Sequence, residues 1–385
     1  MDSKQEKMIE KRFSSLTRAF AADEPSSSMS WKSGGQEYTA QLEQQYSSDP
    51  TGTDHVVVEI STVENGTRLS TKLRMKRLAF SDFAQFVDRW DPDVQMHADE
   101  IDGRFHSNDE INASTFGKIP IFRGHVTTAA REWHMDNGGS WAPRKMFPAG
   151  IEWGASRILL PKDYLPFPRG ESARDDQIER FEHDARIVFY PDGTYVVRSP
   201  GNPSKMLARH ALARPAHYLL AADDVTLYVS GVVHGKVLVY SPKSIVIERN
   251  LVYATAPNVA GADDYLGLVS DRTIEIAEPD VTGPGDLRID ASIYARSRFV
   301  VHDYLSRPSG TLIVRGALAA GSVSATEPRY ATRVVFDKRL EHTRAPSFPV
   351  TDRYELEPWD GVWTAGPADS AAAPNGALNA FQPPN

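Results

Sequence analysis

The feature that most constrains the fold is a succession of very short apolar runs between Val232 and Val323. Runs such as 237–239, 245–247 and 274–276 are separated by Gly, Asn, Asp and Pro. They are too short for helices, and most alternate apolar with polar residues, which is the period of half-buried strands. No run can bury its own apolar face, so the faces must stack on one another. This pattern predicts a β-solenoid, in which each coil contacts its neighbours.

The runs are spaced unequally, at about seven to fifteen residues, which favours an irregular β-helix over a strict repeat array. The fold class that we predict is therefore mainly β, with an irregular right-handed parallel β-helix over residues 91–364. The segments 101–112 and 119–128 have the same form and are expected to be its first rungs. The pattern breaks over about residues 134–225, where a polar helical stretch at 173–181 predicts an inserted α+β excursion.

Two shorter regions flank the predicted β-helix. Residues 1–90 are expected to form an N-terminal helix and β-hairpin module, with an amphipathic helix that ends before Pro25. The hairpin is predicted at Asn65-Gly66, because this dipeptide between strand-like runs is the strongest short-range hairpin signal. Asp192-Gly193 gives a second such signal inside the excursion. Residues 365–385, rich in Ala, Pro, Asn and Gly, are expected to be a flexible tail.

The composition argues against several classes of protein. The chain has 385 residues, a formal net charge of -8 and a pI of about 5.8, which argues against a general nucleic-acid surface. It has no cysteine, which removes disulfides, thiolate nucleophiles and cysteine-based metal sites together. No window approaches about eighteen consecutive apolar residues. The N-terminus has no basic-then-apolar signal pattern.

The order of the β-rich segments resembles a bacterial family. The chain is similar to the pilin-like β-helix proteins associated with type IV pilus assembly, many of them domains of unknown function and some of them accessory or minor pilins. The stretches that carry the resemblance are DGRFHSNDEI, FRGHVTT, ARIVFYPDGTYVV, VTLYVSGVVHGKVLVYSPKSIVIERNLVYA, DDYLGLVSDRTIEI, LRIDASIYARSRFVV, GTLIVRGALA and RVVFDKRLEHTRAPSFP. The likeness covers residues 80–348.

This resemblance implies a non-enzymatic structural or accessory subunit of a type IV pilus or a related secretion or surface apparatus. The expected location is the bacterial cell envelope, periplasmic or extracellular, and the expected partners are other pilus or envelope proteins. Members of the family usually begin with a hydrophobic helix that anchors the subunit, whereas this sequence opens on an amphipathic one. We therefore expect membrane attachment only through a helix absent from this chain, or else a soluble relative. A weaker alternative is a bactofilin-like self-assembling scaffold.

Acidic residues offer a second class of function, because β-helix folds also include polysaccharide lyases and hydrolases. A carboxylate pair on neighbouring coils could act as acid and base or hold Ca²⁺. Most of the candidates lie at or beside turns, where Asp bonds its own backbone, so the structural interpretation is favoured. The candidates are Asp263, Asp264, Asp271, Asp280, Asp286 and Asp290.

The histidines and the common catalytic motifs give no reaction centre. Three loose pairs occur in the sequence, namely His97 and His106, His125 and His134, and His210 and His217. None has the i, i+4 spacing with an intervening acid that typifies a helical zinc site. Gly-x-Ser-x-Gly, a phosphate-binding loop and a dinucleotide fingerprint are all missing. We predict no catalytic residue, no cofactor, no metal and no nucleic-acid partner.

Aromatic residues supply the one predicted binding patch. They surround Asn137-Gly138-Gly139 and are Trp133, Trp141, Phe147 and Trp153. Such a cluster either packs the excursion onto the coils or binds a surface glycan or a protein, since aromatics supply large rigid contact areas. A glycan-binding adhesin thus joins the carbohydrate-active enzyme as the alternative function. Trp359 and Trp363 are expected to cover the last coil, because an open solenoid end must be protected.

Overall fold

The described part of the chain is mainly β, and its helices are short. The computed structural model describes residues 26–115, 117–135, 142–167 and 173–366. The helix predicted before Pro25 lies outside these residues, as does the predicted tail beyond Gly366. The chain divides into two units: a smaller one, residues 1–46, 54–76 and 354–385, and a larger one, residues 47–53 and 77–353.

The smaller unit is built on a sheet whose strands follow one another in order, β1-β2-β3-β4-β27, with β28 paired to β4. Its strands are β1 (Ser26–Ser33), β2 (Gln36–Gln45), β3 (His55–Glu64), β4 (Thr67–Ala79), β27 (Val350–Leu356) and β28 (Thr364–Gly366). The predicted hairpin is confirmed: Glu64 of β3 lies opposite Thr67 of β4, and Asn65 and Gly66 have φ of 50° and 77°. These positive angles are those that a two-residue hairpin turn requires.

One face of this sheet is apolar. Along β3 buried residues alternate with partly exposed ones, as a strand with one wet face requires. Trp359 and Trp363 pack against this face, and the Trp359 indole N–H donates to Thr71 Oγ1 at 3.0 Å. The expectation that both tryptophans cover the last coil is therefore wrong. Their rings pack against apolar side chains of the antiparallel sheet, to which the chain returns at β28.

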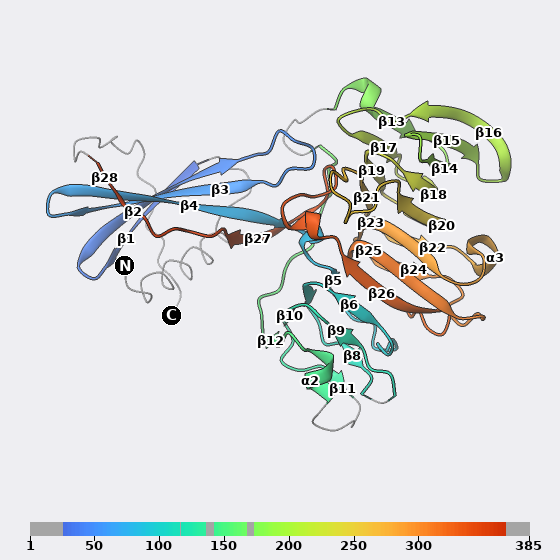
Figure 1. The fold of residues 1–385 in the computed structure, drawn as a ribbon, viewed down its shortest axis with the longest axis horizontal. Helices are drawn as coiled ribbons and strands as arrows, with labels where there is room; N and C mark the ends of the chain where they lie inside the picture. Colours follow the sequence, from blue (N-terminus) through green and yellow to red (C-terminus); the bar gives the residue numbers. More distant parts are fainter. Residues whose placement is uncertain (1–25, 116, 136–141, 168–172, 367–385) are drawn as a thin grey trace. The chain divides into compact units, whose positions relative to one another are not determined.

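Parallel strand pairing dominates the larger unit (Figure 1). Three parallel ladders can be followed through it. The first contains β13 (Ile178–Phe181), β17 (His217–Ala221), β19 (Lys236–Ser241), β21 (Tyr265–Ser270), the C-terminal halves of β23 (Leu287–Ala295) and β25 (Gly310–Ala320), then β5 (Gln85–Val87), β7 (Phe105–Ser107), β10 (Val126–Thr128) and β12 (Ile151–Trp153).

The other two ladders share several of these long strands. The second contains β14 (Ala185–Tyr190), β18 (Thr226–Val233), β20 (Ser244–Tyr253), β22 (Thr273–Ile276) and β24 (Arg298–Val301). The third contains the C-terminal parts of β18 and β20, the N-terminal halves of β23 and β25, then β26 (Tyr330–Phe336), β6 (Glu100–Asp102) and β9 (Ile121–Phe122).

The remaining elements of the larger unit are short or lie beside the ladders. Two strands pair as a small parallel sheet, β8 (Asn112–Ala113) and β11 (His134–Met135). Two more extend β14 antiparallel, β15 (Thr194–Ser199) and β16 (Asn202–Ala211). The helical turns are η1 (Phe80–Asp82), α2 (Ala142–Met146), η3 (Asp175–Gln177), α3 (Pro279–Thr282) and η4 (Lys338–Glu341). The hairpin predicted at Asp192-Gly193 is confirmed by the β14 and β15 pair.

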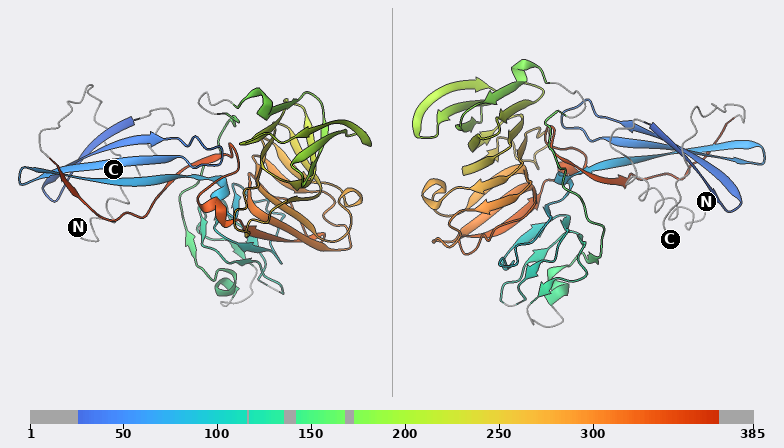
Figure 2. Two further views of the ribbon diagram at one scale, coloured as in Figure 1. Left: turned by 45° about the horizontal axis from the view of Figure 1, so that its top comes forward. Right: turned by 180° about the vertical axis from the view of Figure 1, so that it is seen from behind.

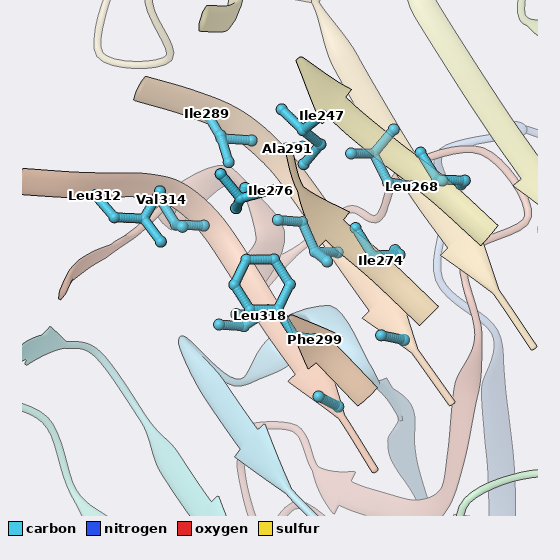
Figure 3. Packing of buried hydrophobic residues seen from close by; sticks show 14 of the residues in the cluster. Ile247, Leu268, Ile274, Ile276, Ile289, Ala291, Phe299, Leu312, Val314 and Leu318 are labelled. Carbon is cyan, nitrogen blue, oxygen red and sulfur yellow. The ribbon is translucent and has the colours of Figure 1, made fainter. Parts of the chain in front are cut away.

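Apolar side chains stack in register inside the ladders. In the second ladder Leu227 lies opposite Ile245, Ile245 opposite Ile274, and Ile274 opposite Phe299. All four are essentially inaccessible to water and belong to one hydrophobic cluster that runs through the unit (Figure 3). The stacking follows from the short apolar runs of the sequence, since each strand buries its inward face only against the strands above and below it.

Glycine allows the strands to bend where two ladders meet. Gly316 lies within β25, between its third-ladder and first-ladder halves, and has φ of +140°. A Cβ atom at this position would lie 2.1 Å from the carbonyl oxygen of Ala291 on the neighbouring strand. Only glycine therefore fits this corner without displacing the backbone.

The strands do not pair in the order of the chain. Leu318 of β25 lies opposite Gln85 of β5, and Val334 of β26 lies opposite Ile101 of β6. The strands of residues 85–153 thus continue the ladders beyond the C-terminal strands, and Figure 2 shows the larger unit from two further sides. The prediction that 101–128 forms the first rungs is correct about its strands and wrong about their place.

The predicted α+β excursion over 134–225 also needs correction. β13, β14 and β17 fall within that range and pair in the first and second ladders. The helix predicted over 173–181 is absent: η3 is one turn long, and β13 follows it directly. Most polar residues of this segment lie in η3 or before it, and within β13 only the Phe181 side chain is buried.

A connecting segment, residues 155–167, covers the outer face of the first ladder, and we call it the strap. Near one end, the Ile158 backbone exchanges hydrogen bonds with the Asn108 side chain. Further along, the Tyr164 ring lies 4.9 Å from Tyr240 on β19, and Phe167 lies 4.8 Å from Tyr218 on β17. The chain must run along the first ladder between β12 and β13, because these two consecutive strands lie at its opposite ends.

Candidate functional site

Three of the four predicted binding aromatics lie together near β12. The Trp133 ring centroid is 5.3 Å from that of Phe147 and 5.8 Å from that of Trp153. Trp133 and Phe147 are buried in the main hydrophobic cluster, whereas Trp153 is 39% exposed. Trp141 lies outside the described residues. The cluster thus has a buried side, which belongs to the core, and one indole that a ligand can reach.

The fold explains why aromatics gather at this place. Among the described residues, β12 pairs only with β10, so the first ladder ends there. The interior beneath it contains Phe105 and Phe122, whose rings lie 5.9 Å and 5.6 Å from Trp133. Large rings fill the widening space at an end of a ladder where no further strand stacks. Packing therefore accounts for Trp133 and Phe147, and binding remains a prediction for Trp153.

A shallow polar cleft of about 450 Å³ lies over the turns that follow β7, β10 and β12. It is lined by Asn108, Asp109, Glu110, Ala129, Ala130, Arg131, Glu132, Ala155 and Arg157. The Asp109 carboxylate accepts the backbone N–H groups of Trp90 and Glu110, at 2.9 and 3.0 Å. Glu110 and Glu132 are exposed. Free carboxylates and guanidinium groups around one cleft suit a ligand rich in hydroxyl groups.

Two of the six candidate aspartates are buried and bridge neighbouring segments. The Asp264 carboxylate accepts the backbone N–H of Gly235 at 2.7 Å on one oxygen and that of Thr255 at 2.8 Å on the other. Asp290 is fully buried in β23, accepts the backbone N–H of Tyr253 at 3.2 Å and pairs with both donor nitrogens of Arg288. Carboxylates bonded in this way on both oxygens are positioned to hold neighbouring segments of the chain together.

The other four aspartates lie apart from these two. Asp286 accepts the backbone N–H of Thr311 at 2.7 Å, and Asp271 accepts the Tyr240 hydroxyl at 2.6 Å. Asp263 is exposed and pairs with Lys236 at 3.0 Å, and Asp280 lies in the first turn of α3. Within the described ranges, no group of three or more His, Asp or Glu side chains is arranged to hold a metal ion.

Two of the candidate histidines are buried and neutral. His106 contacts Thr127 Oγ1 through Nδ1 at 2.7 Å and Asn108 Oδ1 through Nε2 at 3.0 Å. Burial lowers the pKa of His106 to about 4, and it lowers that of His217 to about 4 as well. Both imidazoles are therefore uncharged near neutral pH.

His217 takes part in a polar chain that the sequence did not reveal. Its Nδ1 accepts the backbone N–H of Ala213 at 3.2 Å, so Nε2 carries the proton and donates it to the Tyr195 hydroxyl at 3.0 Å. The Tyr195 hydroxyl in turn donates to the Glu179 carboxylate. Burial, and then the bond to Glu179, raises the pKa of Tyr195. The direction of the hydrogen bonds from His217 through Tyr195 to Glu179 is thus fixed, and the three residues lie on separate strands with no local sequence signal.

No helix among the described residues is long and apolar enough to cross a bilayer.

Comparisons with known proteins assign no family to the chain. No protein-family model matches the chain, and no curated protein matches it. Among solved structures, the chain is similar to the competence-associated pilin ComZ from Thermus thermophilus, with 12% sequence identity and a TM-score of 0.30. The alignment covers 89% of this chain and 88% of that chain. A TM-score of this size assigns neither a family nor a fold.

Proposed function

We propose that this protein is a non-enzymatic structural or accessory subunit of a bacterial type IV pilus or a related secretion or surface apparatus. The order of its β-rich segments, which resembles that of pilin-like β-helix proteins, supports the kind of apparatus. The hydrogen bonds that its buried carboxylates make within the fold support the non-enzymatic role. Its location is then the cell envelope, periplasmic or extracellular, and its partners are other pilus or envelope proteins.

The scaffold in this proposal is a right-handed parallel β-helix. Three parallel ladders share one apolar interior, and the long strands β18, β20, β23 and β25 each pass from one ladder to another. Parallel strands of one sheet are joined by right-handed crossovers in about 98% of known cases. The inserted β15 and β16 and the strap are then outward additions to this scaffold.

The observation that carries the proposal is the bonding of Asp264 and Asp290. A carbohydrate-active β-helix enzyme needs carboxylates that face a groove and remain free to exchange protons with a substrate. These two buried carboxylates instead bond to backbone N–H groups and to an arginine of the coils themselves. Replacing either carboxylate would therefore destabilise the fold and would not remove a catalytic group.

Cell fractionation tests the location and the assembly. An epitope tag inserted after Gly261, in an exposed loop between β20 and β21, leaves the ladders intact. We expect the tagged protein in the envelope and in surface fibres sheared from whole cells, where it crosslinks to pilus components. A pool confined to the cytosol, with no crosslink to any pilus or envelope protein, would contradict the proposal.

A second candidate function, recognition of a surface glycan, is favoured by the polar cleft and by exposed Trp153. The cleft-lining residue Ala155 follows Trp153 by two positions, so an indole and exposed carboxylates belong to one region of the chain. Aromatic rings and carboxylates together are typical of sugar recognition. We expect any such binding to be lost in Trp153→Ala and in a Glu110→Gln, Glu132→Gln double variant.

Incubation with a panel of bacterial polysaccharides separates the two candidates and the enzyme. Binding without new chain ends supports an adhesin role within the surface apparatus. Release of new reducing or unsaturated ends, abolished in the double variant, would show an enzyme and overturn the non-enzymatic proposal. Glu152→Gln is the matched control, because Glu152 is exposed on β12 but does not line the cleft.

A further inference from the structure

A small cavity lies where the two groups of coils meet. It has a volume of about 70 Å³ and is bounded by residues of the C-terminal coils, such as Phe299 and Leu318, and by residues of the N-terminal coils, such as Trp90. The walls are mostly apolar side chains of the solenoid interior. Polar side chains also line it: Gln85, Asp99 and Glu327, together with Gln95, Ser324, Thr326 and Thr332.

Gln85 occupies an interior position in β5. Phe86 packs on the outer face with Phe80, whereas Val87 belongs to the interior cluster. Since side chains alternate along a strand, Gln85 points to the same side as Val87, opposite Leu318 of β25. It is 5% exposed, and its Oε1 is buried without a hydrogen-bond partner. A buried acceptor left unpaired destabilises the fold, so a hydrogen-bond donor bound at Gln85 Oε1 would be favourable.

Two of the other polar groups of the cavity are carboxylates. The Asp99 carboxylate accepts the backbone N–H groups of His97 and Thr332, both at 3.3 Å, and a hydrogen bond from the Thr332 side chain. Glu327 accepts the backbone N–H of Ala98 at 3.3 Å and lies 3.4 Å from His97 Nδ1. Burial, and then the nearby Glu327, raises the pKa of Asp99 to about 6. At neutral pH this buried carboxylate is therefore ionised.

We propose that this cavity binds a small protonated amine. The ammonium group donates to Gln85 Oε1 and neutralises Asp99 and Glu327, and the alkyl part lies against Phe299 and Leu318. One unpaired acceptor, a buried carboxylate and apolar walls together select a compact cation with a short apolar tail over an anion or a neutral alcohol. The inference is independent of the function proposed above.

The size of the cavity limits the ligand. Its volume is about half of the ~150 Å³ engineered cavity that accepts benzene, which leaves room for two or three carbon atoms beside the nitrogen. The usual ceiling on affinity per atom restricts a ligand of three or four non-hydrogen atoms to a Kd no tighter than about 0.04–0.5 mM. The Trp90 indole N–H donates to Val94 O at 2.7 Å, so its ring is held in place at the wall and can report occupancy.

The test is a titration of the full chain with ethylammonium, followed by the Trp90 indole resonance and by thermal unfolding. We expect a saturable shift of that resonance and a rise in Tm. Ethanol, the neutral analogue, should bind about tenfold more weakly or worse, since it lacks the charge-assisted hydrogen bond. Tetramethylammonium, which has no N–H donor, should give no saturable shift.

Variants then assign the site. Gln85→Met and Asp99→Asn should each abolish the saturable shift, whereas Asp102→Asn, exposed on the same β6 strand region, should leave it unchanged. If the variants fail to fold, the comparison of ethylammonium with ethanol on the unmodified chain still decides. No saturable shift up to about 50 mM, far above the expected Kd, or an equal response to ethanol, would overturn the proposal and leave a cavity filled with water.

Discussion

Replacing Asp264 with alanine should destabilise the larger unit strongly. The side chain is 3% exposed, and its two oxygens accept the N–H groups of Gly235 and Thr255 at 2.7 and 2.8 Å. A hydrogen bond to a charged group contributes about 1.5–3 kcal/mol, so the loss of both should lower the free energy of unfolding by about 3–6 kcal/mol. Asp264→Asn retains one acceptor and should cost about half as much.

Amide hydrogen exchange measures this effect locally, which matters because two units can unfold separately. The Gly235 and Thr255 amides should lose about a hundredfold to ten-thousandfold of their protection in Asp264→Ala. Asp263→Ala is the matched control: its side chain is 68% exposed and pairs with Lys236, so about 0–1 kcal/mol is expected. Equal effects of the two alanine variants would refute the structural role of Asp264 and return it to the catalytic candidates.

Three further predictions concern packing, pH and the aromatic cluster. Gly316→Ala should lower the free energy of unfolding by about 2–5 kcal/mol, because its Cβ would meet the Ala291 carbonyl oxygen at 2.1 Å; an unchanged urea midpoint would contradict this. His106 has a pKa of about 4 in the folded chain against 6.5 unfolded, so the unfolded state binds more protons as the pH falls. Its contribution to stability is present above pH ~6.5 and is lost towards pH 4. Between pH 7.5 and 5 that loss should be about 2 kcal/mol, and urea titrations of His106→Gln should show a correspondingly flatter profile. Trp133→Ala should cost about 3–5 kcal/mol and Trp153→Ala about 1 kcal/mol or less, since only the first ring is buried; similar urea midpoints for the two would show that the cluster is not packed as described.

Local features of the fold could be predicted from the sequence because local physics determines them. The hairpin at Asn65-Gly66 follows from two residues that tolerate positive φ, and the short runs after Val232 follow from the two-residue period of a strand. The prediction that turn aspartates bond their own backbone does not describe Asp286, which accepts the backbone N–H of Thr311, 25 residues further along the chain. The role of Asp290 could not be predicted either, because it lies inside β23 and its hydrogen bond is to Tyr253 of another strand.

Non-local features could not be predicted from one sequence. The polar stretch over 173–181 has the composition of an exposed helix, and only its parallel pairing with β17 makes the end of it a strand. Likewise no local pattern shows that Gln85 stacks on Leu318 or that Asp99 meets Thr332. The cavity was therefore invisible in the sequence, since its lining comes from two segments far apart along the chain.

The pairing of N-terminal strands with the last strands of the ladders has a consequence for the timing of folding during synthesis. The Thr332 backbone N–H donates to Asp99, 233 residues earlier in the chain. At a translation rate of about 5–20 residues per second, the strands β5 and β6 leave the ribosome about 10–50 s before their partners exist. During that interval their unpaired edges are available to other chains, which is the usual origin of aggregation in nascent β proteins. A chaperone that holds the N-terminal coils until the C-terminal ones are complete would raise the yield of folded protein.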